Sequence, residues 1–87
     1  MTFEWDPSKA ASNRRKHRIS LADAVGVFED PRALTDDDPH PDENRFHTLG
    51  MDYIGRLLVV TWTGRPGAIR IISARKATRA ERDQYEG

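Results

Sequence analysis

The sequence predicts an α+β fold: a small antiparallel sheet, with two helices before it and one after it, in the order β-α-α-β-β-β-β-α. Three observations predict this class. Two runs with strand character, Leu57–Trp62 and an Ile-rich run that begins at Ala68, are separated by a turn rich in glycine and proline. Helix starts at Asp6-Pro7 and at Ser20 precede all the long strands. A capping box, Thr78-Arg79-Ala80-Glu81, begins a last helix.

The N-terminal quarter predicts a short edge strand and two helices. Thr2–Trp5 alternates apolar and polar residues, which favours a strand. The first helix runs from Ser8 to about His17 and is mostly polar. The second runs from Leu21 to about Glu29, and its apolar residues recur at helical spacing. We therefore expect the second helix to be the one that covers the sheet.

The middle of the chain predicts a short strand over Ala33–Thr35 and then an acidic loop over Asp36–Asp42. Three consecutive carboxylates, Asp36–Asp38, also raise the alternative of a metal site, which EDTA would empty. The prolines around them and the absence of a regular ligand spacing favour a solvated loop.

Three strands should follow the acidic loop. Arg45–Met51 is the first, and a hairpin connection over Asp52–Arg56 leads to Leu57–Trp62, which is apolar on both faces and so predicts a central strand. In the third strand Ile69 and Ile71 share one face, and Arg70 points to the other.

Composition predicts one domain over residues 1–87. The chain has no cysteine, which excludes disulfides, thiolate nucleophiles and Cys-based zinc sites. It shows no signal-peptide pattern and no apolar run long enough for a membrane span, so we expect a cytoplasmic protein that makes no membrane contact.

Charge is segregated along the chain although the formal net charge is zero. Five cations lie between Lys9 and Arg18, seven acids between Glu29 and Glu43, and six cations between Arg65 and Arg82. Two basic blocks that meet in space would form a surface for an anionic ligand.

Several runs of residues together resemble one family, the BrnT toxins. They are Phe3-Glu4-Trp5-Asp6-Pro7, Lys16-His17, Asp30-Pro31 and, most specifically, Ile69-Arg70-Ile71-Ile72-Ser73-Ala74-Arg75-Lys76. Two departures from the family pattern are Arg18, where glycine is common, and His47, where the family more often has an apolar or small residue.

The resemblance implies a toxin of a type II toxin–antitoxin system, with a RelE-like fold and ribonuclease activity. It also implies a BrnA-like antitoxin with a ribbon-helix-helix DNA-binding domain, assembled with the toxin as a heterotetramer that binds operator DNA through the antitoxin. No cofactor or metal is expected.

Metal-free RNA cleavage needs a base, an acid and positive charge on the phosphate, and this chemistry selects the candidate residues. Arg45 and Arg70 are candidates to clamp the phosphate, and His17 is the candidate for proton transfer. The remaining candidates are cations. Arg75 and Lys76 are added to the catalytic set, and the expected RNA-backbone contacts are Lys9, Arg14, Arg15, Lys16 and Arg79.

Each candidate also has an ordinary structural interpretation, such as a solvated helix face or a helix-end histidine that the helix dipole favours. A second function therefore stays open: a non-catalytic protein that acts only with its antitoxin as a co-repressor.

Overall fold

The computed structural model describes residues 1–87 and contains nine elements. In chain order they are β1 (Thr2–Glu4), α1 (Pro7–His17), α2 (Leu21–Ala24), the 3-10 helix η1 (Val25–Glu29), β2 (Leu34–Asp38), β3 (Arg45–Met51), β4 (Leu57–Arg65), β5 (Ala68–Lys76) and α3 (Arg79–Glu86). The predicted α+β class and the order of elements are confirmed. None of the helices is long and apolar enough to cross a membrane.

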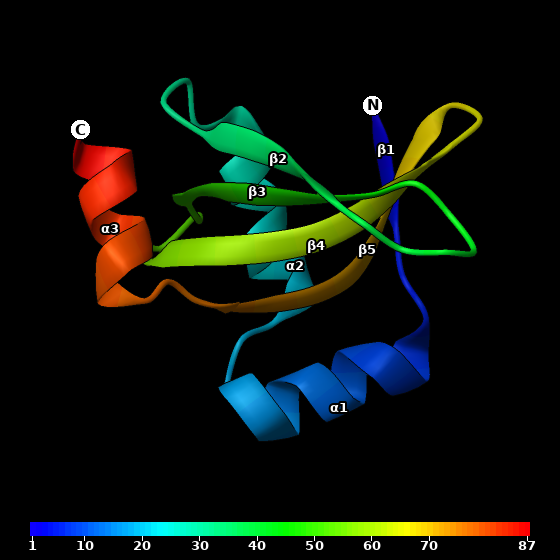
Figure 1. Cartoon of the computed structure of the whole chain (residues 1–87). Coiled ribbons are helices and arrows are strands. Elements are labelled where there is room, and N and C mark those ends of the chain that lie inside the picture. Colours follow the sequence, from blue (N-terminus) through cyan, green and yellow to red (C-terminus); the bar gives the residue numbers. More distant parts are fainter.

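The five strands form one sheet in the order β1-β5-β4-β3-β2, so β4 is central, as its two apolar faces predict (Figure 1). The long strands pair antiparallel, and the short edge strand β1 runs parallel to β5, so the sheet is mixed. A bulge in β5 shifts its register to β4 between Thr61 and Trp62. Ile72 is the extra residue there, and it puts Arg70 and Ser73 on the same face of the sheet.

One face of the sheet, the helix-covered face, packs under α2, η1 and part of α1. Its core contains Leu58, Val60 and Ile71 from the central strands and Ile19 and Leu21 from the helical segment, all at most 2% exposed. Burial of these apolar side chains is the main interaction that holds the helices on the sheet.

The opposite face, the open face, carries Arg45, His47, Thr61, Thr63 and Arg70. We expected the helices on one face of the sheet, but α3 packs against one end of the open face, beside β3 and the start of β4 (Figure 1). Its anchor is Tyr85, which is buried with Leu49, Leu57 and Val59. The Tyr85 hydroxyl also donates a 2.6 Å hydrogen bond to Asp30, so this ring is structural.

Helix α1 is held by a buried asparagine, because the helix itself is almost entirely polar. The Asn13 amide donates to the carbonyl of Ile19 (3.1 Å) and accepts from the backbone N–H of Ala74 in β5 (3.0 Å). The bond to Ala74 satisfies an edge N–H of β5 that β1 is too short to reach, and the two bonds together fix α1 and the α1–α2 connection along the outer edge of β5.

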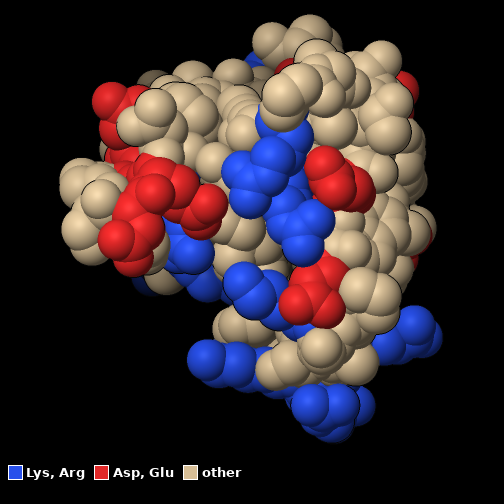
Figure 2. Space-filling view, turned by 90° about the vertical axis from the view of Figure 1, so that its right-hand side faces the viewer, with Lys and Arg blue, Asp and Glu red and all other residues tan.

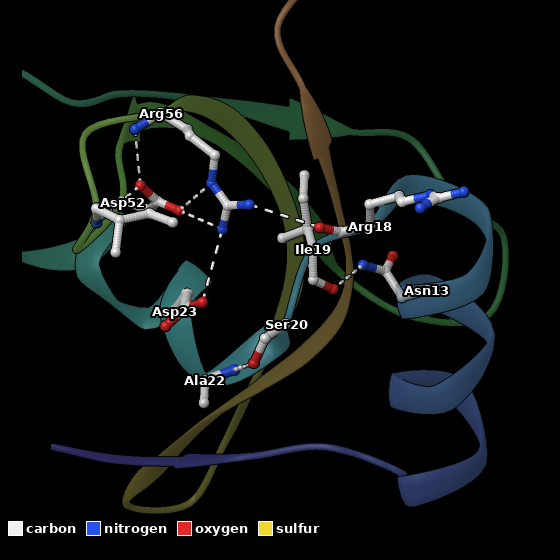
Figure 3. Close-up of polar contacts among 9 residues, drawn as sticks. Asn13, Arg18, Ile19, Ser20, Ala22, Asp23, Asp52 and Arg56 are labelled. Carbon is white, nitrogen blue, oxygen red and sulfur yellow. Dashed lines mark hydrogen bonds and ion pairs between the residues drawn. The ribbon is translucent and has the colours of Figure 1, made fainter.

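A second polar cluster joins the β3–β4 hairpin to the helices (Figure 3). Arg56 pairs with the fully buried side chain of Asp52 at 2.7 Å and with Asp23 of α2 at 3.7 Å. It also donates to the carbonyl of Arg18, at the end of α1. One guanidinium therefore fixes the hairpin, α2 and the α1–α2 connection relative to one another.

Two expectations about local structure are wrong. The second helix is α-helical only to Ala24 and continues to Glu29 as the 3-10 helix η1. Within η1 the hairpin backbone approaches Gly26 so closely that a Cβ would lie 2.5 Å from the nitrogen of Tyr53. The acidic run Asp36–Asp38 belongs to β2 and not to a loop. It pairs with the basic end of β3, Asp36 opposite His47 and Asp38 opposite Arg45. The backbone pairing and the diagonal ion pair of Asp38 with His47 (3.3 Å) outweigh the low strand preference of aspartate.

Candidate functional site

Two arginines lie side by side on the open face because strand register puts them there. Arg45 of β3 and Arg70 of β5 both pair with Thr63 of β4, which lies between them. Since neighbouring strands are about 4.8 Å apart, the Cα atoms of the two arginines are separated by about 10 Å. Arginine side chains are long enough that two guanidinium groups whose Cα atoms have this spacing could reach a single phosphodiester lying over Thr63 between them.

Both arginines are held by carboxylates in the structure. Arg45 donates to Glu43 at 2.9 Å, Arg65 approaches the same carboxylate at 3.8 Å, and Arg70 pairs with Glu4 at 3.1 Å. The hydrogen bond from Arg45 lowers the pKa of Glu43, and the charge of Arg65 adds to the effect. Because these side chains are partly exposed, a phosphate has room to take over from the carboxylates.

A histidine lies in the next row of the same face. His47 is two residues along β3 from Arg45, and its Nε2 is 3.3 Å from the carboxylate of Asp38. The row continues through Thr61 to Ser73. A His–Asp pair next to two arginines combines proton transfer with positive charge, the two requirements of RNA cleavage without a metal.

A comparison with protein families decides the identity. The family model described as "Ribonuclease toxin, BrnT, of type II toxin-antitoxin system" matches residues 5–81. The chain belongs to the BrnT family.

The fold agrees with this assignment. The structure is similar to the crystal structure of the Brucella abortus ribonuclease toxin BrnT, with a TM-score of 0.68 and 22% sequence identity. The similarity covers 91% of this chain and 99% of that one, and at this identity it concerns the fold. No match is found among curated proteins. As a BrnT-family member the chain is the toxin of a type II toxin–antitoxin system, and such a toxin has an antitoxin partner.

The structure separates Arg70 from two cations that we expected in the catalytic set with it, Arg75 and Lys76. Arg75 is on the open face but forms a bidentate pair with Glu81 of α3, at 2.8 and 2.9 Å. The hydrogen bonds from Arg75, together with that from the backbone of Thr78, lower the pKa of Glu81 from 4.5 to about 2. Lys76 pairs with Leu58 in the sheet register and so lies on the opposite face. Arg75 therefore anchors α3, and Lys76 does not reach the two arginines.

The basic residues of α1 divide between two surfaces. Lys9, Lys16 and His17 line a groove of about 250 Å³ between α1 and β5, together with Ser73. Because Ser73 also ends the His47 row, this groove adjoins the open face. Arg14 and Arg15 lie with Arg18 in a separate hollow of α1 that includes none of the sheet residues.

Figure 2 shows how the charged side chains are distributed on one side of the molecule. A band of Lys and Arg runs down the middle with Asp and Glu beside it, and further basic side chains lie at the level of α1. The last predicted RNA contact, Arg79, is exposed at the start of α3. The first basic block thus lies beside β5 at Ile72 and Ser73, but no cation of the Arg65–Arg82 block lines this groove, so the structure does not bring the two blocks together there.

His47 is the site residue that the sequence interpretation set aside, because it departs from the family pattern. The signal that would have found it is its period-two spacing from Arg45, which places both side chains on one face of any strand. The metal alternative gains no support from the geometry of Asp36–Asp38. Asp37 points to the other face, and no three His, Cys, Asp or Glu side chains in the chain form a group that could hold a metal ion.

Proposed function

We propose that this BrnT-family toxin is a metal-independent endoribonuclease whose active site is the Arg45–Arg70 pair with His47. The observation that carries the proposal is the sheet register: Arg45, Thr63 and Arg70 form one row across the open face, and His47 starts the next. The family description as a ribonuclease toxin supports the same chemistry.

In this mechanism the ribose 2′-oxygen attacks the adjacent phosphorus and the bond from phosphorus to O5′ breaks. His47, oriented by Asp38, accepts the 2′-hydroxyl proton, and the departing O5′ takes a proton from water. Arg45 and Arg70 stabilise the extra negative charge that develops on the phosphate oxygens. The products are a 2′,3′-cyclic phosphate and a 5′-hydroxyl end.

The α1 groove is the proposed path for the neighbouring backbone. Lys9 and Lys16 contact phosphates there, and His17, in the same groove, is the second candidate for proton transfer. Arg14, Arg15 and Arg79 would add attraction at longer range, because they are exposed but lie outside the groove.

The proposed partner is a BrnA-like antitoxin with a ribbon-helix-helix domain, which would neutralise the toxin and carry the complex to operator DNA as a heterotetramer. This follows the family resemblance. The main alternative is a non-catalytic co-repressor. It is favoured by one observation: Arg45 and Arg70 are already engaged by Glu43 and Glu4.

The test is cleavage of naked RNA by purified protein in EDTA. We expect wild type to cut, and Arg70→Ala and His47→Ala to cut about 100-fold more slowly or worse, with His17→Ala measured beside them. Arg82→Ala is the matched control for Arg70→Ala, because it removes the same residue type from an exposed position outside the site.

Cleavage with 2′,3′-cyclic phosphate ends and a selective loss in the two site variants would establish the site. Absence of cleavage by folded wild type would favour the co-repressor. Activity that disappears in EDTA would favour a metal nuclease.

A further inference from the structure

The open face carries a hollow beside His47 that the mechanism above leaves unused. It has a volume of about 280 Å³ and lies between the outer strands and α3. Its lining includes Leu34, Asp36, His47, Leu49, Val59 and Gln84. Leu49 and Val59 are buried and form an apolar floor, whereas Leu34 is 44% exposed and forms part of the rim.

The carboxylates around this His47 hollow differ in whether they already take part in an ion pair. Asp36 lies opposite His47 in the strand register, yet its carboxylate takes part in no ion pair, because His47 pairs with Asp38 instead. Glu81 also lines the hollow but is held by Arg75 and by the backbone of Thr78. The hollow therefore offers one free carboxylate, that of Asp36, and the side-chain amide of Gln84.

An apolar floor with a free carboxylate and an amide at its rim matches a flat heterocycle with a polar edge. Among the RNA bases only guanine presents two adjacent donors, N1–H and N2–H, to the paired oxygens of a carboxylate. Its neighbouring O6 is an acceptor that an amide N–H can reach. Adenine, cytosine and uracil each offer a carboxylate one donor group on this edge, so they would bind it less well.

We propose that the His47 hollow binds a guanine base of the RNA, with Asp36 accepting from N1–H and N2–H and Gln84 donating to O6. The inference rests on the proposed function for its substrate, single-stranded RNA, whose unpaired bases are read along this edge. Because a base and its phosphate are joined through one ribose, a guanine in the hollow keeps its phosphate near His47 and Arg45. The toxin would then cut next to guanosine in preference to the other nucleosides.

The experiment compares binding of the four nucleoside 3′-monophosphates to wild type, Asp36→Asn and Asp37→Asn by titration calorimetry. Asp37 is the matched control, because it is the next residue of β2 and points to the other face. Both variants lose one negative charge, so the general attraction for the nucleotide phosphate should rise by the same amount in both. The ratio of affinities between bases therefore isolates the recognition of guanine.

We expect wild type and Asp37→Asn to bind 3′-GMP about tenfold or more tightly than the other three nucleotides, and Asp36→Asn to bind all four within about threefold. Equal affinities in wild type, or a guanine preference that survives in Asp36→Asn, would overturn the proposal.

This outcome is separate from that of the cleavage test. A protein that prefers 3′-GMP but cuts no RNA would retain the guanine site and refute the nuclease. A protein that cuts RNA but binds the four nucleotides equally would retain the nuclease and refute the guanine site.

Discussion

The two faces of the sheet differ in the interactions that their side chains make. The helix-covered face is packed with apolar side chains such as Leu58 and Val60, both 0% exposed, and its buried polar anchor, Asn13, has its amide oxygen and nitrogen both hydrogen-bonded. The open face is lined outside α3 by charged and hydroxyl side chains, and its arginines are paired with carboxylates. The helix-covered face therefore stabilises the fold, whereas the arginines of the open face can change their anionic partner.

This difference separates the contacts that hold the fold from the ion pairs that a ligand could replace. Buried apolar contacts carry no charge and are not directional, so neither a change of protonation nor an incoming anion replaces them. A half-exposed guanidinium is different, because it loses little when a phosphate replaces its carboxylate partner. Glu43 and Glu4 thus balance the charge of the two arginines, and in the proposed mechanism the RNA phosphate takes their place.

Leu58→Ala is expected to have the largest effect on this comparison. It opens a cavity in the helix-covered face and should lower the free energy of unfolding by about 2–5 kcal/mol in urea denaturation. Ile54→Ala is the control, because Ile54 is 63% exposed at the hairpin and should cost less than about 1 kcal/mol. Equal losses in the two variants would mean that the face is not the source of stability.

Glu43→Gln tests the exchangeable charge of the open face. Removal of this carboxylate frees Arg45 and Arg65, so RNA affinity should rise about threefold to tenfold, with a change in stability below about 1 kcal/mol. Asp42→Asn removes the same charge from the neighbouring exposed position and should change affinity less. Both effects are measured by fluorescence anisotropy with a non-cleavable oligonucleotide, and equal changes would mean that only net charge matters.

Glu81→Gln should have the smallest effect on stability, and that effect should be visible only in how the free energy of unfolding depends on pH. The pKa of Glu81 is about 2 in the folded chain and 4.5 ordinarily, so its ion pair with Arg75 stabilises the fold above about pH 4.5. That contribution is lost as pH falls toward 2, and partial solvent exposure limits it to about 1 kcal/mol.

Wild type should therefore lose more stability than Glu81→Gln between about pH 5 and pH 2, as measured by urea denaturation across this range. Glutamine keeps the capping interaction with Thr78, so the helix start is preserved. Glu86→Gln, which removes an exposed carboxylate from the same helix, should follow wild type. Parallel pH curves for wild type and Glu81→Gln would contradict the assignment.

Much of the fold could be predicted because its signals are local. Asp6 caps α1 and Ser20 caps α2 with side-chain hydrogen bonds, and Thr78 and Glu81 form the complete capping box of α3. Arg18 shows where a local signal is missing: it ends α1 with a φ of 60°, a conformation that glycine normally supplies.

The candidate site could be predicted only in part, because sharing a face depends on pairing between distant strands. Arg45 and Arg70 were both identified, but their common partner Thr63 follows from the antiparallel register. Lys76 was assigned with Arg75, and alternation along β5 separates the two. His47 was set aside on its sequence alone and is brought next to Asp38 by the pairing of β2 with β3.

The amino-acid sequence by itself determined where helices and strands begin, which strand is central and which toxin family the chain belongs to, because caps, periodicity and motifs act over a few residues. Tertiary structure alone decided that Asp36–Asp38 form a strand, that α3 lies on the other face, and that a bulge at Ile72 puts Arg70 and Ser73 on one surface. Those outcomes depend on partners far away in the chain, whose pairing energies exceed the weak local preferences of the residues they move.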